Sequence, residues 1–254
     1  MVGSLFLEAL TVHDDWNAFL SESIIDELLK IEKHVITNGF LPETGKVLRF
    51  LTFPLSSARI IILGQDPYPQ PGAATGRAFE VGNLVSWGQP FKNVSLKNIL
   101  RALYKAYTGE IISYCRLKEK FYNEFPVLPP GQLFGHWEKQ GVLLLNTSFT
   151  CEPGKPGSHY QLWNSFSLRL LEFIAEHAPG ATWFLWGNHA MDATQQLTLA
   201  KRIETLHPMM CYSAPLRTND FLFGDINCFR QFADEIDWTG YPLKRDEKAA
   251  GRLF

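Results

Sequence analysis

The strongest candidate for a chemical site in this chain is the polar segment Gly64-Gln65-Asp66-Pro67-Tyr68, which follows the apolar run 60–63. Such a run predicts a strand that is buried on both faces of a parallel sheet. The polar residues then fall at the carboxyl end of the strand, where open α/β sheets bind their ligands. Asp66 is therefore a candidate to activate water or to stabilise a developing cation. Because Asp-Pro dipeptides also begin turns, a purely structural role for Asp66 is the alternative.

Two further polar residues follow expected strands later in the chain. Asn146 comes directly after the apolar run 142–145, and His207 comes after the segment 202–206. The amide of Asn146 could recognise an amide-like edge such as that of a pyrimidine, or it could cap a turn. His207 could donate a hydrogen bond to a leaving group that gains negative charge, or it could be a surface or core histidine. If the strands are parallel, Asp66, Asn146 and His207 meet at one edge of the sheet.

Two aromatic residues accompany the polar segment. Tyr68 and Phe79 could stack on a planar base, although core packing is the ordinary role of such residues. The loop 70–76 contains glycine, but it lacks the Gly-Lys-Ser/Thr of a P-loop and the G-x-G-x-x-G of a dinucleotide site. No G-x-S-x-G elbow is present either. The sequence therefore does not support a nucleoside triphosphate, a dinucleotide or a serine-hydrolase triad.

Strands that alternate with helices must position these residues. Runs at 59–63, 142–145 and 181–186 predict buried strands, and 202–206 predicts a shorter, more polar one. Helical patterns are found at 21–31, 95–107, 162–177, 189–199 and 229–236, with Ser95 as the expected N-cap of the second. This order predicts the α/β class, with a three-layer α/β/α architecture and a central four-stranded, mainly parallel sheet.

The composition is that of an ordinary globular protein, with 46% hydrophobic and 20% charged residues among 254. We expect a single domain over residues 1–254, with a loosely ordered tail at about 244–254. The four cysteines lie far apart, so we expect no disulfide framework, no metal site and no cofactor. We expect no membrane association, and a cytoplasmic protein, or one of the nucleus or another intracellular compartment.

The net charge of −2 argues against a protein that is coated in positive charge, but it allows a local basic face for nucleic acid. Lys97, Arg101 and Lys105 recur every four residues and could line one side of a helix. For these three residues alone, an ordinary solvated helix face is the expectation.

Taken together, the motifs resemble uracil-DNA glycosylase of family 1 over about residues 40–232. Six ordered matches are far more specific than any single one of them. They are Gly64 to Tyr68, Ala74-x-Gly76-x-x-Phe79, Ser95-Leu96-x-Asn98-Ile99, residues 140–146, Phe184-Leu185-Trp186-Gly187 and His207-Pro208. The resemblance implies a monofunctional glycosylase that flips uracil out of DNA and hydrolyses its N-glycosidic bond, leaving an abasic site for base excision repair.

The resemblance also implies two catalytic residues. Asp66 would orient the attacking water and offset the positive charge on the sugar. His207 would hydrogen-bond the uracil oxygen that gains charge as the base leaves. The reaction would need no metal and no cofactor.

Four further residues would bind uracil if the resemblance holds. Asn146 would hold the pyrimidine edge, Phe79 would stack on the ring, and Gln65 would contact it through its backbone. Tyr68 would block the position of a 5-methyl group, so thymine would be refused by a steric clash.

The chain departs from the family pattern in the loops that would grip DNA. A proline follows Tyr68 where the family usually has histidine, and the stretch 89–94 keeps little of the family's proline. After His207 the family continues Pro-Ser-Pro-Leu, whereas residues 208–216 read Pro-Met-Met-Cys-Tyr-Ser-Ala-Pro-Leu. We therefore expect a rebuilt DNA-binding surface that consists of Pro69, Ser95, Gly187, Asn188, Met209, Met210, Cys211, Tyr212 and Ser213.

The wedge that fills the gap in the base stack could come from Met209, Met210, Tyr212 or Leu216, or this could be a surface loop without a role in DNA binding. The expected partners are uracil-containing DNA, single- or double-stranded, and a DNA-mimicking inhibitor protein that grips the same surface. We expect a monomer. Two other functions stay open: an enzyme with a different lesion or strand preference, and a non-catalytic DNA- or protein-binding relative. An acid, an amide and an imidazole on one rim argue against the second.

Overall fold

The structure is a computed structural model that describes residues 3–243, so the tail predicted at 244–254 lies outside the described residues. Four strands form one sheet in the order β2-β1-β3-β4, and all neighbouring strands are parallel. The predicted α/β class is thus confirmed, and the sheet is wholly rather than mainly parallel. The strands are β1 (Ile60–Gly64), β2 (Val142–Asn146), β3 (Thr182–Trp186) and β4 (Lys201–Thr205).

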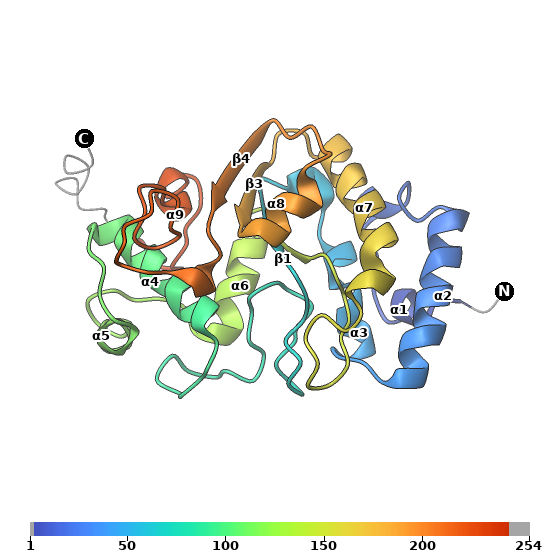
Figure 1. The fold of residues 1–254 in the computed structure, drawn as a ribbon, viewed down its shortest axis with the longest axis horizontal. Helices are drawn as coiled ribbons and strands as arrows, with labels where there is room; N and C mark the ends of the chain where they lie inside the picture. The colour runs from blue at the N-terminus through green and yellow to red at the C-terminus, as the bar shows by residue number, and fades with distance from the viewer. Residues whose placement is uncertain (1–2, 244–254) are drawn as a thin grey trace.

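Helices cover both faces of the sheet and complete the predicted three layers. Figure 1 shows α4, α6 and α9 on one side of the strands and α2 and α7 on the other. The longer helices are α2 (Glu22–Asn38), α4 (Val94–Thr108), α6 (Pro130–Glu138) and α7 (Tyr160–His177). The shorter ones are α1 (Leu5–Glu8), α3 (Thr44–Val47), α5 (Tyr114–Lys120), α8 (Asn188–Thr194) and α9 (Cys228–Gln231).

Two separate hydrophobic cores result from the alternation of side chains along the strands. In β1, Ile60 and Ile62 pack into the core that α4, α6 and α9 cover, and Ile61 and Leu63 pack into the core under α2 and α7. Every residue of β1, β2 and β3 is buried. This explains why continuous apolar runs mark these strands in the sequence.

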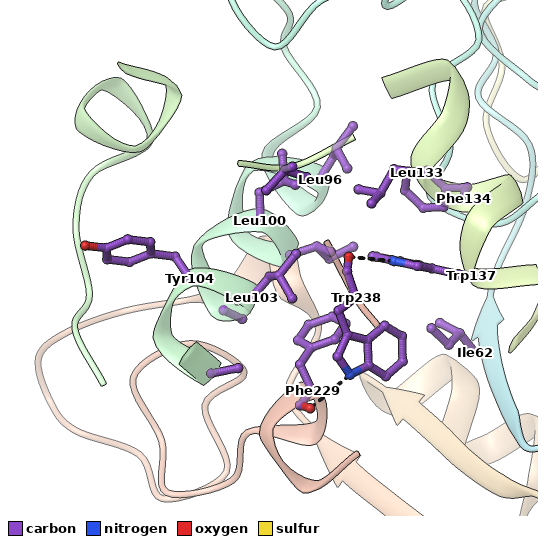
Figure 2. Packing of buried hydrophobic residues seen from close by; sticks show 14 of the residues in the cluster. Ile62, Leu96, Leu100, Leu103, Tyr104, Leu133, Phe134, Trp137, Phe229 and Trp238 are labelled. Atoms are coloured by element: carbon purple, nitrogen blue, oxygen red, sulfur yellow. Dashed lines mark hydrogen bonds between the residues drawn. The ribbon is translucent and has the colours of Figure 1, made fainter. Parts of the chain in front are cut away.

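Two buried tryptophans in the first core, Trp137 and Trp238, donate their indole N–H groups to backbone carbonyls (Figure 2). Trp137 Nε1 donates to the carbonyl of Trp238 at 2.8 Å, and Trp238 Nε1 donates to the carbonyl of Phe229 at 3.0 Å. The first bond joins the chain after α9 to α6, which lies directly before β2, and the second joins it to α9 itself.

Some predicted boundaries are wrong. Ser95 lies inside the first turn of α4, and Asn93 occupies the N-cap position, because Val94 is already helical. Helix α8 ends at Thr194 rather than at 199, and α9 ends at Gln231 rather than at 236. After α9 the chain bends back so that the Trp238 ring can be buried, and this packing overrides the local helical pattern.

Within residues 3–243, no helix is both long and apolar enough to cross a membrane. In the same part of the chain, no group of three or more His, Cys, Asp or Glu side chains is placed to hold a metal ion.

Candidate active site

The parallel sheet brings the predicted polar residues to one edge. Asp66 lies two residues beyond β1, Asn146 is the last residue of β2, and His207 lies two residues beyond β4. Strand β1 pairs with both β2 and β3, and Gly64 stands opposite Asn146 in the register. The carboxyl ends of all four strands therefore point to the same rim, as the sequence predicts.

A small cavity opens at this rim. The space between its atoms, including the open solvent at its mouth, is about 200 Å³, and it is lined by Asp66, Pro67, Tyr68, Ala74, Thr75, Gly76, Arg77, Phe79 and Asn146. Gly64 makes room for the amide of Asn146, because a Cβ at this position would collide with Asn146 Oδ1 and with Ala78. The cavity thus brings an acid, an amide and an aromatic ring together at one rim of the sheet.

Asp66 is held in an orientation that keeps its carboxylate near the cavity. Its Oδ2 accepts a hydrogen bond of 2.6 Å from the backbone N–H of Gly157. Burial raises the pKa of Asp66 above its ordinary value, and the Gly157 bond and the nearby His189 only partly oppose this effect. A carboxylate that is partly stripped of water and points at a cavity is a stronger base and a stronger partner for a developing cation.

Phe79 has an unusual backbone conformation. Its φ is +65°, the one positive φ of a residue other than glycine in the described part of the chain. The ring lies 5.3 Å from that of Trp186 and 6.1 Å from that of His207, measured between centroids. A strained backbone at a site is kept only where the surroundings enforce it.

Ion pairs enforce the conformation of the Phe79 loop. Arg77 donates through Nη1 to both carboxylate oxygens of Glu80, at 3.2 and 3.0 Å, and through Nη2 to Glu138 at the end of α6. The side chains of Arg77 and Glu80 are 9% and 6% exposed. Two residues that flank Phe79 are thereby fixed to each other and to a helix of the core. We refer to these three residues as the Arg77 clamp.

Tyr68 lines the cavity next to Asp66 and packs against the core under α4. Burial raises the pKa of its hydroxyl to about 12, so the ring stays neutral. Gln65 is exposed, and its carbonyl accepts hydrogen bonds from Ser148 N at 2.8 Å and Thr147 Oγ1 at 3.0 Å. These bonds hold the backbone at which the sequence predicts contact with the base.

His207 is oriented by its own loop. Its Nδ1 accepts a hydrogen bond of 3.1 Å from Met209 N, so in the neutral ring the proton is on Nε2. Burial, and next to it His189, lowers the pKa of His207. A neutral imidazole with its proton on Nε2 can donate to an oxygen that gains negative charge.

Helix α4 holds the His207 loop in place. Asn98 is buried and donates through Nδ2 to the carbonyl of Pro208 at 2.7 Å, while its Oδ1 accepts from Arg101 Nη1 at 2.8 Å. Sequence reasoning placed Asn98 within a family motif without giving it this contact.

The three regularly spaced cations of α4 do not form a solvated face, so that expectation is wrong. Lys97 lies over the rings of Phe91 and Tyr114, at 5.0 and 5.7 Å from their centroids. Arg101 donates to the carbonyl of Ile112, and Lys105 donates to carbonyls of the loop near Leu222. Their positive charges stabilise loops of this protein.

The loop after His207 presents large apolar side chains to solvent. Met209, Met210, Tyr212 and Leu216 are 58%, 44%, 52% and 67% exposed. The guanidinium of Arg217 lies 5.0 Å from the centroid of the Tyr212 ring and pairs with Asp220 at 2.7 Å. All four predicted wedge candidates are therefore exposed on one loop.

The other predicted DNA-binding residues differ in how they are placed. Ser213 and Asn188 are exposed, Pro69 and Ser95 are half-buried, and Gly187 is buried. Cys211 is half-buried and its thiol donates to the carbonyl of Pro208 at 3.1 Å, and its role in DNA binding stays a prediction.

Three residues at the site escaped sequence reasoning. Gly157 binds Asp66, and Thr147 and His189 bind each other at 2.7 Å. The position of His189, two residues after the Gly187 motif, was the one sequence signal that could have identified it. Gly157 and Thr147 act through a backbone N–H and a hydroxyl, and no residue spacing marks such contacts in advance.

The chain is similar to known proteins in sequence and in fold. Residues 50–229 match the model of the family described as the Uracil DNA glycosylase superfamily. A uracil-DNA glycosylase of Varicella-zoster virus (strain Dumas) is 32% identical over 238 residues, which cover 90% of this chain and 71% of the viral protein.

Solved structures are similar as well. The wild-type UNG of Nitratifractor salsuginis superimposes with a TM-score of 0.65 and 26% identity, covering 80% of this chain and 87% of that one. A mimivirus UNG variant in complex with UGI has a TM-score of 0.60 at 21% identity, and covers 85% of this chain and 74% of that one.

Proposed function

The chain belongs to the uracil-DNA glycosylase superfamily and excises uracil from DNA, and from this premise we propose how its residues perform the hydrolysis. The observation that carries the assignment of roles is the meeting of Asp66, Asn146 and Phe79 in one cavity, with the His207 ring 6.1 Å from that of Phe79 between centroids. The target nucleotide leaves the base stack, because its glycosidic bond is out of reach inside a duplex.

The residues that line the cavity recognise uracil. Asn146 pairs with the pyrimidine edge, the ring of Phe79 stacks on the base, and the backbone at Gln65 contacts it. Tyr68 closes the side of the cavity at which thymine would carry its methyl group. The small volume supports this role, because a packed pocket discriminates by shape.

Hydrolysis uses two groups on opposite sides of the scissile bond. The Asp66 carboxylate orients a water molecule toward C1′ of the sugar and offsets the positive charge that develops there. As the C1′–N1 bond breaks, its electron pair leaves with uracil, and Nε2–H of His207 donates to the uracil oxygen that gains charge. The raised pKa of Asp66 and the neutral state of His207 suit these two tasks.

The test is release of uracil from labelled single- and double-stranded oligonucleotides in EDTA, followed by alkaline cleavage at abasic sites. We expect cleavage with the wild-type protein and a loss of about 10²–10⁴-fold in rate for Asp66→Asn. The matched control is Asp26→Asn on the exposed face of α2, which should retain the wild-type rate. No cleavage of either substrate by the wild-type protein would contradict the proposal.

The exposed loop 209–216 binds duplex DNA. An apolar side chain that enters the base stack fills the space left by the flipped base. Replacing Met209, Met210 and Tyr212 with serine should lower the rate on double-stranded substrate about tenfold or more and spare single-stranded substrate. Equal rates on duplex DNA before and after this change would show that the loop has no such role.

We also propose that the protein acts as a monomer in the cytoplasm and that a DNA-mimicking inhibitor can bind the same loop surface. The complex of the mimivirus relative with UGI supports an inhibitor of this kind. Size-exclusion chromatography, and loss of excision when UGI is added, test the two statements.

A further inference from the structure

His189 is a titratable side chain at the rim of the sheet. The proposed function gives it no role, either in binding uracil or in catalysis. It is the second residue of α8 and is half-buried. Gly187, two residues earlier, lies so close to His207 that a Cβ on it would be 2.8 Å from the Cβ of His207. Helix α8 therefore begins against the loop that carries His207.

Hydrogen bonds also join His189 to the segment that carries Asp66. His189 Nε2 lies 2.7 Å from Thr147 Oγ1, and Thr147 Oγ1 donates to the carbonyl of Gln65 at 3.0 Å. The backbone N–H of Thr147 donates to the carbonyl of Gly64 at 3.1 Å. The hydroxyl of Thr147 thus links His189 to the carbonyl of Gln65, the residue before Asp66.

This arrangement fixes the tautomer of His189. The Gln65 carbonyl can only accept, so the single hydroxyl proton of Thr147 is directed to it. Thr147 Oγ1 must then accept from His189, which places the proton of the neutral ring on Nε2. Nδ1 is left as a hydrogen-bond acceptor, and no side chain in residues 3–243 donates to it.

The surroundings favour the neutral ring. The groups that face His189 are Asp66, Asp192, His207 and the ring of Tyr160, whose centroid lies 5.1 Å away. Burial lowers the pKa of His189, and the attraction of Asp66 and Asp192 does not restore it. The lone pair on Nδ1 is therefore available near neutral pH.

We propose that His189 is a further catalytic residue for uracil excision, whose Nδ1 accepts a hydrogen bond from the water that Asp66 directs at the sugar. The inference rests on the proposed function. In the step, the water oxygen bonds to C1′ while the C1′–N1 pair leaves with uracil. One water proton passes to the Asp66 carboxylate, and the other stays on the new hydroxyl, held by Nδ1. His189 takes up no proton, and its contribution is to hold the water in line.

Two amide variants separate the two ring nitrogens. In His189→Gln the amide nitrogen lies near the place of Nε2 and can keep the bond to Thr147, but nothing accepts at the place of Nδ1. In His189→Asn the amide oxygen lies near the place of Nδ1, and the bond to Thr147 is lost. Single-turnover rates and KM on a uracil oligonucleotide are measured for both, with melting temperatures to establish folding.

We expect kcat to fall about 10²-fold in His189→Gln with KM changed by less than about threefold, and His189→Asn to keep roughly ten times the kcat of the glutamine variant. The matched control is His177→Gln at the exposed end of α7, which should match the wild type.

Better activity of the glutamine variant than of the asparagine variant would overturn the proposal, because the bond to Thr147 would then be what matters. Equal rates in both variants, whether lowered or unchanged, would overturn it too. A wild-type protein that releases no uracil contradicts the proposed function itself, which distinguishes that failure from a failure of the inference.

Discussion

Tyr68 is the residue on which the choice between uracil and thymine depends. It lines the cavity beside Asp66, and its ring is fixed by packing against the core under α4. Tyr68→Ala should therefore give measurable release of thymine from a thymine oligonucleotide while uracil release falls about tenfold or less. Tyr122→Ala, at an exposed tyrosine, is the control. If the Tyr68 variant releases uracil but no thymine, another wall of the cavity excludes the methyl group.

The Asp66 carboxylate should lower the free energy of unfolding at neutral pH, although it is needed for activity. Because its pKa is raised in the folded protein, the folded state binds the proton more tightly than the unfolded state does. Stability is therefore lost as pH rises through the raised pKa, and the loss persists at neutral pH. Asp66→Asn keeps an acceptor for Gly157 and removes the charge. With solvent screening, its melting temperature at pH 7 should rise by up to about 3 °C while activity is lost. A fall in melting temperature would contradict this account.

Sequence reasoning identified the residues that directly follow strands, and it missed those that act through a neighbour. Asp66, Asn146 and His207 could be found because the carboxyl ends of parallel strands share an edge. His189 and Thr147 could not be given their contact, because the bond between them joins loops after two different strands. The contact of the Cys211 thiol with the carbonyl of Pro208 was not predictable, because it depends on the path of the loop.

At the scale of elements, the Arg77 clamp fastens a loop to a helix. Arg77→Met would leave Glu80 buried with its charge unpaired, at a cost of about 3–5 kcal/mol of unfolding free energy. Because the loop also carries Phe79, KM for uracil DNA should rise. Urea unfolding and excision kinetics measure the two effects.

A second variant tests the reason for that loss. Arg77→Met combined with Glu80→Gln removes the unpaired charge and should recover about half of the lost free energy. No recovery in the double variant would indicate that packing of the arginine stem, rather than its charge, holds the loop.

The elements themselves were easier to predict from the sequence than their ends. The strands are marked by apolar runs because both faces of the sheet are covered. The end of α9 was not predictable, because the burial of Trp238 bends the chain away from the helix. The N-cap of α4 lies two residues earlier than predicted, because Asn93 and Ser95 are residue types that both favour this position.

For the molecule as a whole, three histidines make stability depend on pH. Burial lowers the pKa of His159, His189 and His207 below the ordinary value of 6.5. Below that pH the unfolded chain takes up protons that the folded protein does not, so stability falls as pH falls. Urea unfolding at pH 7.5 and 5.5 should show a lower unfolding free energy at pH 5.5.

One variant measures how much His159 contributes to the dependence of unfolding free energy on pH. His159 is 3% exposed and bonds to Thr150 through Nδ1 at 2.9 Å, away from the cavity lining. His159→Gln should reduce the difference between the two pH values, and His177→Gln at the surface should leave it unchanged. An unchanged difference in His159→Gln would remove this residue from the explanation.

The central place of β1 also determines when the enzyme can first work. Ile60 stands opposite Val142 on one side and Thr182 on the other, so both neighbours of β1 come from much later in the chain. Pairings of such long sequence separation form slowly, and they cannot form before both segments have left the ribosome. Asp66 is made early in synthesis, but its partner His207 comes beyond β4, the last strand. A nascent chain that contains Asp66 but not yet His207 therefore has no active site, and excision of uracil begins only when the sheet is complete.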